Sequence, residues 1–284
     1  MSVITRFAPS PTGHLHLGSA YSAFFAERCA REAGGRFLIR IEDIDRERCR
    51  DLYAQAIFED LAWLGLRWET PVRYQSAHFD DYINACARLD ALQLLYPCFC
   101  SRREIRAEIR AAGYAPHAAP AGPEGPVYPG TCRDLSPAER QQRIASGASY
   151  ALRLDTTRAL AQTGPLTWFD RSRGEQPVNL EKLGDVVLAR KDSPTSYHLS
   201  VTVDDHLQGI TLVTRGDDLF AVTPLHRLLQ ALLGYNTPEY LHHGLRTGPE
   251  GQRYSKRDKS LSIRYLRESG LSPRQVQEMA HADL

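Results

Sequence analysis

The chain has 284 residues and a formal net charge of +1, with 42% hydrophobic and 24% charged residues. These values are typical of an ordinary globular protein with one large domain or two smaller ones, and any nucleic-acid surface must be local because the overall charge is balanced. Six cysteines in a chain of this length do not indicate a disulfide scaffold. No apolar run approaches 18 residues and the N-terminus has no signal-peptide pattern, so we expect a cytoplasmic protein with no membrane partner.

The first element expected is a short strand over residues 3–7, which leads through a turn with two prolines and a glycine into a helix that starts at Gly18 and Ser19. A strand, a glycine-containing turn and a helix N-terminus form an anion site, because unpaired backbone N–H groups and the positive end of the helix dipole point at the ligand. His14 and His16 lie in this turn, within reach of phosphate oxygens, and Gly18 leaves room for a flat ring. An isolated H-x-H-x-G run is otherwise an ordinary strand-to-helix turn.

A helix that stops at two glycines and a second strand over residues 36–41 come next, and together they predict a parallel sheet with its ligand site at the carboxyl ends of the strands. Three carboxylates, Glu42, Asp43 and Asp45, follow the second strand directly. Asp45 is a candidate N-cap for the next helix, which is expected to run to about residue 64. Glu42 and Asp43 lie beside an anion-binding turn, where a carboxylate repels phosphate unless it holds a cation or an ammonium group.

The pattern changes after residue 75. Residues 76–185 are expected to form a smaller domain inserted between two parts of a larger one, residues 1–75 and 186–284. The insertion is expected to begin with a helix from Ser76 to near Tyr96-Pro97 and a basic helix with Arg102, Arg103, Arg106 and Arg110. An extended loop is expected over residues 113–130, which contain five prolines and four glycines. A capped helix from Ser136 and strands at 149–154 and 166–170 are expected after it.

Three cysteines of the insertion, Cys98, Cys100 and Cys132, have a spacing compatible with a structural zinc site, and three free thiols are the plain alternative. A zinc site needs a fourth ligand. His117 is the chemically ordinary choice and Tyr128 the unusual one, and the residues alone leave this choice open.

The last part of the chain is expected to contain a strand at 186–190, a helix at 197–207 that ends in the polar run Asp204-Asp205-His206, a strand at 210–214 and a leucine-rich helix from Thr223 to Gly234. Residues 253–259 are strongly basic: between residues 246 and 267 there are seven basic residues and two acidic ones. Such a loop is most often a solvated face. Two short helices are expected at the end of the chain.

Four runs together resemble the signatures of the glutamate- and glutamine-specific class I aminoacyl-tRNA synthetases. The first is P-S-P-T-G followed by H-L-H-L-G, in which residues 16–19 take the place of the family's HIGH tetrad and end in Ser19. The second is R-I-E-D-I-D, at the end of the second strand, and the third is the set Y-H-L, D-D-H, G-I-T and R-G-D-D-L at residues 197–219. The fourth is R-Y-S-K-R at residues 253–257, which takes the place of the family's KMSKS signature. The resemblance implies an α/β fold, namely a Rossmann-like class I catalytic domain with an inserted α+β zinc-containing domain.

The resemblance also implies roles for single residues. It assigns glutamate binding to Arg6, Ala8, Ser10, Glu42, Tyr197 and Arg215, ATP binding to His16, Gly18 and Lys256, catalysis to His16 and Lys256, and one structural zinc to Cys98, Cys100, Tyr128 and Cys132, with His117 as the competing fourth ligand. Glu42 is expected on the amino group of glutamate and Arg6 on a carboxylate. ATP is expected with Mg²⁺, and Lys256 is expected to neutralise the triphosphate as pyrophosphate leaves.

Only 27 residues follow Arg257, whereas an anticodon-binding domain needs on the order of 100 residues. The chain therefore resembles the glutamyl-queuosine tRNA(Asp) synthetases, the branch without that domain. This implies that it activates L-glutamate without tRNA and transfers it to queuosine in the anticodon of tRNA(Asp), as a monomer. The alternatives are a short conventional synthetase that charges tRNA(Glu), and an RNA-binding relative without catalytic activity.

Overall fold

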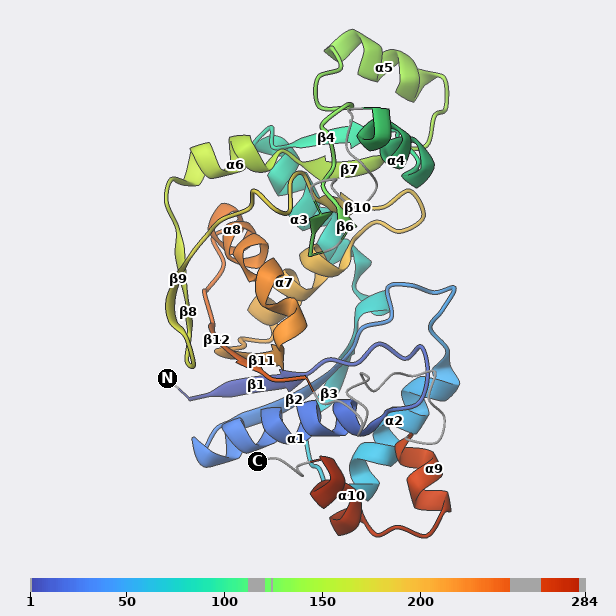
Figure 1. Ribbon diagram of the computed structural model, residues 1–284, viewed down its shortest axis with the longest axis vertical. Helices are drawn as coiled ribbons and strands as arrows, with labels where there is room; N and C mark the ends of the chain where they lie inside the picture. The colour runs from blue at the N-terminus through green and yellow to red at the C-terminus, as the bar shows by residue number, and fades with distance from the viewer. Residues whose placement is uncertain (1, 112–120, 124, 246–261, 281–284) are drawn as a thin grey trace.

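The computed structural model describes residues 2–111, 121–123, 125–245 and 262–280 (Figure 1). Its centre is a parallel sheet. Strands β1 (Ile4–Phe7), β2 (Arg36–Ile41) and β3 (Glu69–Tyr74) pair in the order β1-β2-β3. Strands β11 (Leu212–Gly216) and β12 (Glu239–His243) form a second parallel pair. The Thr211 N–H donates to the Ile4 carbonyl at 3.1 Å, which brings β11 alongside β1.

The resulting strand order, β3-β2-β1-β11-β12, is that of a Rossmann-like sheet, whose order reverses between its first strand and the next one added on the other side. The hairpin of β8 (Thr167–Asp170) and β9 (Gly174–Pro177) extends the sheet beyond β12. Ligands of such sheets bind at the carboxyl ends of the strands beside this reversal, here between β1 and β11.

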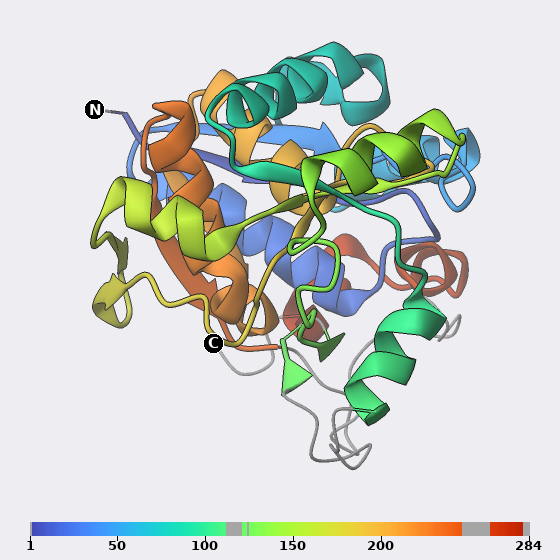
Figure 2. The ribbon, with the colours of Figure 1, turned by 90° about the horizontal axis from the view of Figure 1, so that it is seen from above.

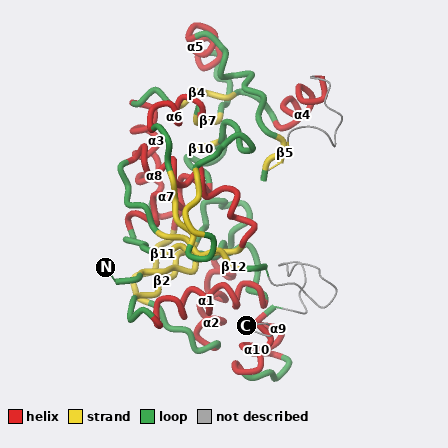
Figure 3. The backbone as a smooth tube through the Cα atoms, turned by 60° about the vertical axis from the view of Figure 1, so that its left-hand side comes forward, coloured by secondary structure: helices red, strands yellow, loops and turns green. Residues whose placement is uncertain are grey.

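Helix α1 (Leu17–Glu32) packs on β1 and β2 through small and aromatic side chains, including Ala20, Tyr21, Ala23 and Phe24. Alanines on this face let the helix approach the sheet closely. Helix α2 (Asp51–Trp63) and the terminal helices α9 (Ile263–Glu268) and α10 (Pro273–Ala280) complete this core. Figures 1 and 3 both place α9 and α10 beside α2, at the end of the molecule farthest from α5 (Pro137–Ala145).

A second core joins residues on both sides of the expected domain boundaries. It contains side chains of α3 (Phe79–Ala91), α6 (Thr156–Thr163), α7 (Tyr197–Leu207), α8 (Thr223–Leu233) and the antiparallel sheet of β4 (Leu95–Cys98), β7 (Ala151–Leu154) and β10 (Val187–Ala189). The division of the chain at residues 76 and 186 stays a prediction. The short helices η1 (Gln75–Ala77) and η2 (Asp217–Val222) connect β3 to α3 and β11 to α8.

Helix α4 (Arg102–Ala111) and the small hairpin of β5 (Ala121–Gly122) and β6 (Gly125–Pro126) lie at one side of the molecule. The view from above shows that α4 projects away from the layered body (Figure 2), and the rotated tube shows the same (Figure 3). In the described part of the chain, no helix is both long enough and apolar enough to cross a membrane.

Several predicted elements are confirmed, and others differ. The capping box at Ser136 is present. Asp45, however, does not cap α2, because the chain first makes a turn in which Asp45 accepts the Arg48 backbone N–H at 3.2 Å, and α2 starts at Asp51. The predicted helix from Ser76 ends at Ala91 instead of near Tyr96, since Tyr96 and Pro97 pair with β7 as part of β4. Neither β3 nor β12 is predicted from the sequence pattern.

The close approach of β1 to the start of β2 depends on Gly35. A Cβ atom there would lie 1.9 Å from the carbonyl oxygen of Val3. A Cβ atom at Gly34 would meet nothing within 4 Å, but an alanine there would have to adopt the φ of +59° that the glycine has. We expect Gly35→Ala to lower the free energy of unfolding by about 3 kcal/mol, at the upper end of overpacking costs, and Gly34→Ala by about 1 kcal/mol. Urea unfolding of both variants measures the difference; equal losses would contradict the role of this contact.

Candidate functional site

Two adjoining cavities lie where the strand order reverses. The first, of about 390 Å³, lies at the N-terminus of α1, and we call it the helix cavity. The second, of about 400 Å³, is lined by Arg6 and Arg215, and we call it the arginine cavity. Both are lined by Phe7, Ser22 and Gly216, from β1, α1 and β11. They share a wall at the carboxyl ends of the two central strands, where this sheet order places ligands.

The wall of the helix cavity includes Ser10, His16, Gly18, Ser19, Asp218, His243 and Leu245. His16 is the N-cap of α1, and its Nδ1 atom accepts the Ser19 backbone N–H at 3.2 Å. The imidazole hydrogen is therefore on Nε2, where it can be donated to an anion. His14 does not line this cavity: its ring packs edge-on against Tyr53 of α2, with centroids 5.1 Å apart. Of the two histidines, His16 alone lines this cavity, and its contact with phosphate stays a prediction.

The segment that contains Lys256 lies outside the described residues, as do His117 and Arg253. The described residues that flank this segment are Leu245, which lines the helix cavity, and Ser262, which forms an antiparallel bridge with His16. The Ile263 N–H donates to the Leu15 carbonyl at 2.8 Å. The described residues on both sides of this segment therefore lie at or beside the helix cavity.

Five of the six residues expected to bind glutamate, Arg6, Ala8, Glu42, Tyr197 and Arg215, line the arginine cavity, and Ser10 lines the adjoining helix cavity. They come from the ends of β1, β2 and β11 and from the start of α7. Burial raises the pKa of Glu42, against the opposing effect of Arg40 and Arg6. Asp43, by contrast, is used structurally: its carboxylate accepts both the backbone N–H and the hydroxyl of Ser76, at 2.8 and 2.6 Å.

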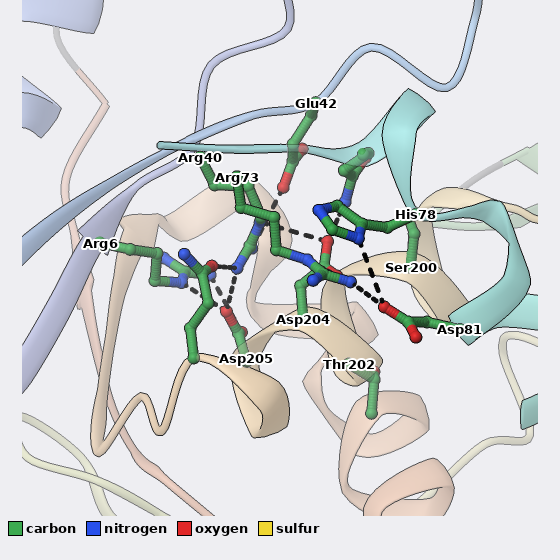
Figure 4. A network of polar contacts seen from close by, with 12 residues as sticks. Arg6, Arg40, Glu42, Arg73, His78, Asp81, Ser200, Thr202, Asp204 and Asp205 are labelled. Carbon is green, nitrogen blue, oxygen red and sulfur yellow. Dashed lines mark hydrogen bonds and ion pairs between the residues drawn. The ribbon is translucent and has the colours of Figure 1, made fainter. Parts of the chain in front are cut away.

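A buried network of ion pairs includes Arg6 and Glu42 of the cavity wall (Figure 4). Asp205 of α7 accepts from Arg6 Nε at 2.9 Å and from Arg40 Nη1 at 2.8 Å. The neighbouring Asp204 accepts from Arg73 Nε at 2.7 Å. The Arg40 side chain is fully buried and also lies 3.3 Å from Glu42. Although burial acts to raise it, the charges of Arg6 and Arg40 hold the pKa of Asp205 below its usual value.

Arg215 has a different environment. Its Nε donates to His242 Nε2 at 3.2 Å, its Nη1 lies 3.1 Å from His226 Nδ1, and its Nη2 donates to the Thr223 hydroxyl at 2.7 Å. All three partners are uncharged, and no carboxylate in the described ranges forms an ion pair with Arg215. These bonds use three of the five guanidinium N–H groups, so two remain for a ligand. An anionic group is therefore favoured in this cavity.

The three cysteines expected to bind zinc are brought together by β4 and the turn after Tyr128. The sulfur atoms of Cys98, Cys100 and Cys132 all lie within 4.8 Å of one another. The Tyr128 hydroxyl lies 3.5 Å from Cys98 Sγ and 3.6 Å from Cys100 Sγ. Four ligands about 2.3 Å from a tetrahedral zinc ion are separated by about 3.8 Å, so this donor set fits a zinc ion. The Phe99 backbone N–H donates to Cys132 Sγ at 3.4 Å, a bond that favours the thiolate form.

A groove of about 900 Å³ extends from the cysteine cluster to Tyr197 and His198 at the start of α7. Basic side chains line it, namely those of Arg102, Arg153, Lys182, Arg190 and Lys191, beside the carboxylates of Asp185 and Asp192. A basic groove of this kind suits the phosphates of a nucleic acid strand. The groove borders the arginine cavity at Tyr197, which lines both.

Sequence reasoning missed the residues that hold the predicted ones in place. Arg40 and Arg73 lie on strands where nothing marks a buried charge, although Arg40 occupies an inward position of β2. The run Asp204-Asp205 is noted in the sequence, but as a polar helix end, whereas both side chains are buried. The histidines around Arg215 come from α8 and β12 and have no shared spacing that would reveal them.

The network predicts a large loss of stability when Asp205 is neutralised. In Asp205→Asn, Arg6 and Arg40 both lose a buried carboxylate, and breaking a buried pair in this way costs about 3–5 kcal/mol. We expect this decrease in the free energy of unfolding by urea denaturation. Glu69→Gln is the control, because Glu69 pairs with Arg36 at the surface, where such pairs contribute little. Similar effects of the two substitutions would show that burial of the network does not matter.

Comparison with known proteins gives three consistent matches. The family described as "tRNA synthetases class I (E and Q), catalytic domain" matches residues 2–280. The chain is 45% identical to a glutamyl-Q tRNA(Asp) synthetase of Rhodobacter capsulatus, over 98% of this chain and 99% of that protein. It is 43% identical to a protein of the same name from Symbiobacterium thermophilum, over 95% of this chain and 83% of that one.

Longer proteins match as well. The structure resembles a glutamate-tRNA synthetase from Elizabethkingia anophelis, with a TM-score of 0.80 and 28% identity over 99% of this chain and 61% of that one. A glutamate–tRNA ligase of Hydrogenobaculum sp. is 38% identical over 95% of this chain and 56% of that protein. The chain thus spans little more than half the length of these two.

Proposed function

Since the chain belongs to the class I tRNA synthetases of the glutamate and glutamine group, we propose that it activates L-glutamate with ATP and transfers it to queuosine in tRNA(Asp). The observation that carries this proposal is the match to a glutamyl-Q tRNA(Asp) synthetase over nearly the full length of both chains. The arrangement of charges in the arginine cavity supports glutamate as the amino-acid substrate. The basic groove beside that cavity supports an RNA as the acceptor.

Glutamate fits the arginine cavity by charge. Glu42 offers a buried carboxylate for the substrate ammonium group, and Arg215 offers two N–H groups to a substrate carboxylate. Arg6 is expected on the other carboxylate, although its Nε and Nη2 already donate to Asp205. Asp205 and the Thr214 carbonyl fix the Arg6 guanidinium, and an N–H remains on each terminal nitrogen. Its role toward the substrate stays a prediction.

ATP is proposed for the helix cavity. The α-carboxylate of glutamate attacks the α-phosphorus of ATP. The bond from this phosphorus to the bridging oxygen breaks, pyrophosphate leaves, and glutamyl-adenylate remains. Negative charge grows on the phosphate oxygens in this step, and donors placed in advance stabilise it. The N-terminus of α1 and the Nε2–H of His16 are donors of this kind. Lys256, the Mg²⁺ that accompanies ATP, and a cytoplasmic location stay predictions from the sequence.

The acceptor step needs a hydroxyl of the tRNA to attack the carbonyl carbon of the adenylate, with AMP as the leaving group. Queuosine carries a cis-diol similar to that of a terminal ribose, so it supplies a suitable nucleophile. We propose that the groove of basic residues next to Tyr197 holds the phosphates of the anticodon strand. Its basic side chains suit the phosphates of an anticodon loop and of an acceptor end alike.

The acceptor is tested with radiolabelled glutamate and two preparations of tRNA(Asp), one from cells that make queuosine and one from cells that cannot. We expect label only on the queuosine-containing tRNA, and we expect it to remain after the 3′-terminal nucleotides are removed. Equal labelling of both preparations, or efficient labelling of tRNA(Glu) at its 3′ end, would identify a conventional charging enzyme instead.

We also propose one structural zinc ion, held by Cys98, Cys100, Cys132 and Tyr128. When bound, zinc would tie the turn after Tyr128 to the end of β4, and it takes no part in the reaction. Metal analysis of the purified protein should give about one zinc per chain, lost in Cys100→Ser and kept in Cys29→Ser, because Cys29 lies in α1 outside the cluster. Zinc retained in Tyr128→Phe but lost in His117→Ala would move the fourth ligand to His117, and no zinc in the wild type would contradict the site.

A further inference from the structure

The guanidinium of Arg215 is held by a chain of buried side chains that reaches back to Asp170. Asp170 lies at the end of β8, and its Oδ2 atom is 2.7 Å from His242 Nδ1. The other ring nitrogen, His242 Nε2, accepts from Arg215 Nε. The side chains of Asp170 and His242 are both completely buried. Three strands or their ends, β8, β12 and β11, thus supply one continuous line of hydrogen bonds toward the arginine cavity.

The donors along this line fix the tautomer of His242. Arg215 can only donate, so Nε2 of His242 must carry its lone pair, and the ring hydrogen must be on Nδ1, where it is donated to Asp170. Burial and the charge of Arg215 lower the pKa of His242 to about 4, so the ring is neutral near pH 7. A neutral acceptor keeps the charge of Arg215 uncompensated, whereas a carboxylate in the same place would neutralise it.

The ring of His242 has no room to turn away. It lies 5.1 Å from the Phe220 ring and 5.9 Å from the Trp168 ring, measured between centroids, and it stacks in parallel with Tyr240. Asp170 is fixed in turn, because its Oδ1 accepts the Ser172 backbone N–H at 2.9 Å. The direction of the Arg215 N–H groups is therefore determined from outside the cavity.

We propose that Asp170, acting through His242, is a positioning residue that aims the Arg215 guanidinium into the arginine cavity and so sets the preference for a side-chain carboxylate over an amide. This inference rests on the proposed glutamate activation and assigns its selectivity to two side chains that do not touch the substrate. Asp205 orients Arg6 with a charge, whereas His242 orients Arg215 without one.

Two substitutions at one position separate the two hydrogen bonds of His242. In His242→Asn the side-chain amide reaches only the place of Nδ1, so the bond to Asp170 is kept and the acceptor for Arg215 is lost. In His242→Gln the amide oxygen reaches the place of Nε2, so the acceptor for Arg215 is kept. His206→Asn is the control, because His206 lies on α7 outside the lining of both cavities and stacks on Tyr235.

The measurement is ATP–pyrophosphate exchange with glutamate and with glutamine. In His242→Asn we expect the KM for glutamate to rise at least about tenfold, the KM for ATP to stay within about twofold, and the preference for glutamate over glutamine to fall. His242→Gln should retain most of the preference and His206→Asn all of it. Asp170→Asn, which allows the ring to carry its hydrogen on Nε2 toward Arg215, should behave like His242→Asn.

Three outcomes would overturn the positioning role of Asp170 and His242. Unchanged preference in His242→Asn and Asp170→Asn, with normal glutamate activation by the wild type, would overturn the positioning role and leave the proposed function intact. A joint rise of the KM for glutamate and for ATP in both His242 variants would indicate a general structural role and would also overturn it. If the wild type shows no glutamate-dependent exchange, the proposed function and this inference both fail.

Discussion

The pairing of Asp204 and Asp205 with three arginines is the interaction on which the rest of the structure depends. Arg6, Arg40 and Arg73 lie on the three strands of one half of the sheet, and both aspartates lie on one turn of α7, far away in the sequence. In a buried setting these charges are costly to desolvate unless every partner is present. Their pairing therefore fixes where α7 sits against the sheet, and with it the position of Tyr197 at the first turn of the same helix.

The arginines of the site differ in their partners and therefore in their roles. Arg40 and Arg73 pair with carboxylates of the protein and serve the scaffold, and Arg6 is shared between the scaffold and the cavity wall. Among the residues that the structure describes, Arg215 has only uncharged hydrogen-bond partners. A single uncompensated guanidinium in a half-enclosed cavity attracts an anion more strongly than several compensated ones. Selectivity at such a site then depends on how rigidly that one group is oriented.

Much of this site is predictable from the sequence, since local runs carry it: the turn at His16, Glu42 after β2, and Tyr197 and Arg215 at the ends of α7 and β11 all follow from short motifs. The end of α3 and the start of α2 are not predictable in the same way. Pairing of Tyr96 with β7 and the turn around Asp45 are decided by contacts that only the folded chain makes. The surroundings of Arg215 are a stronger case, because Asp170, His226 and His242 share no spacing and are brought together only when β8, β12 and α8 pack in the folded chain.

His16 has two tasks, and this has a consequence for how its substitutions are understood. Its ring lines the helix cavity, and the same ring caps α1 by accepting the Ser19 N–H. An alanine at this position removes the cap together with any contact to phosphate, so a loss of activity would combine a frayed helix end with a lost donor. Asparagine keeps an acceptor for the first turn of α1, and the difference between the two replacements isolates what the imidazole itself contributes to chemistry.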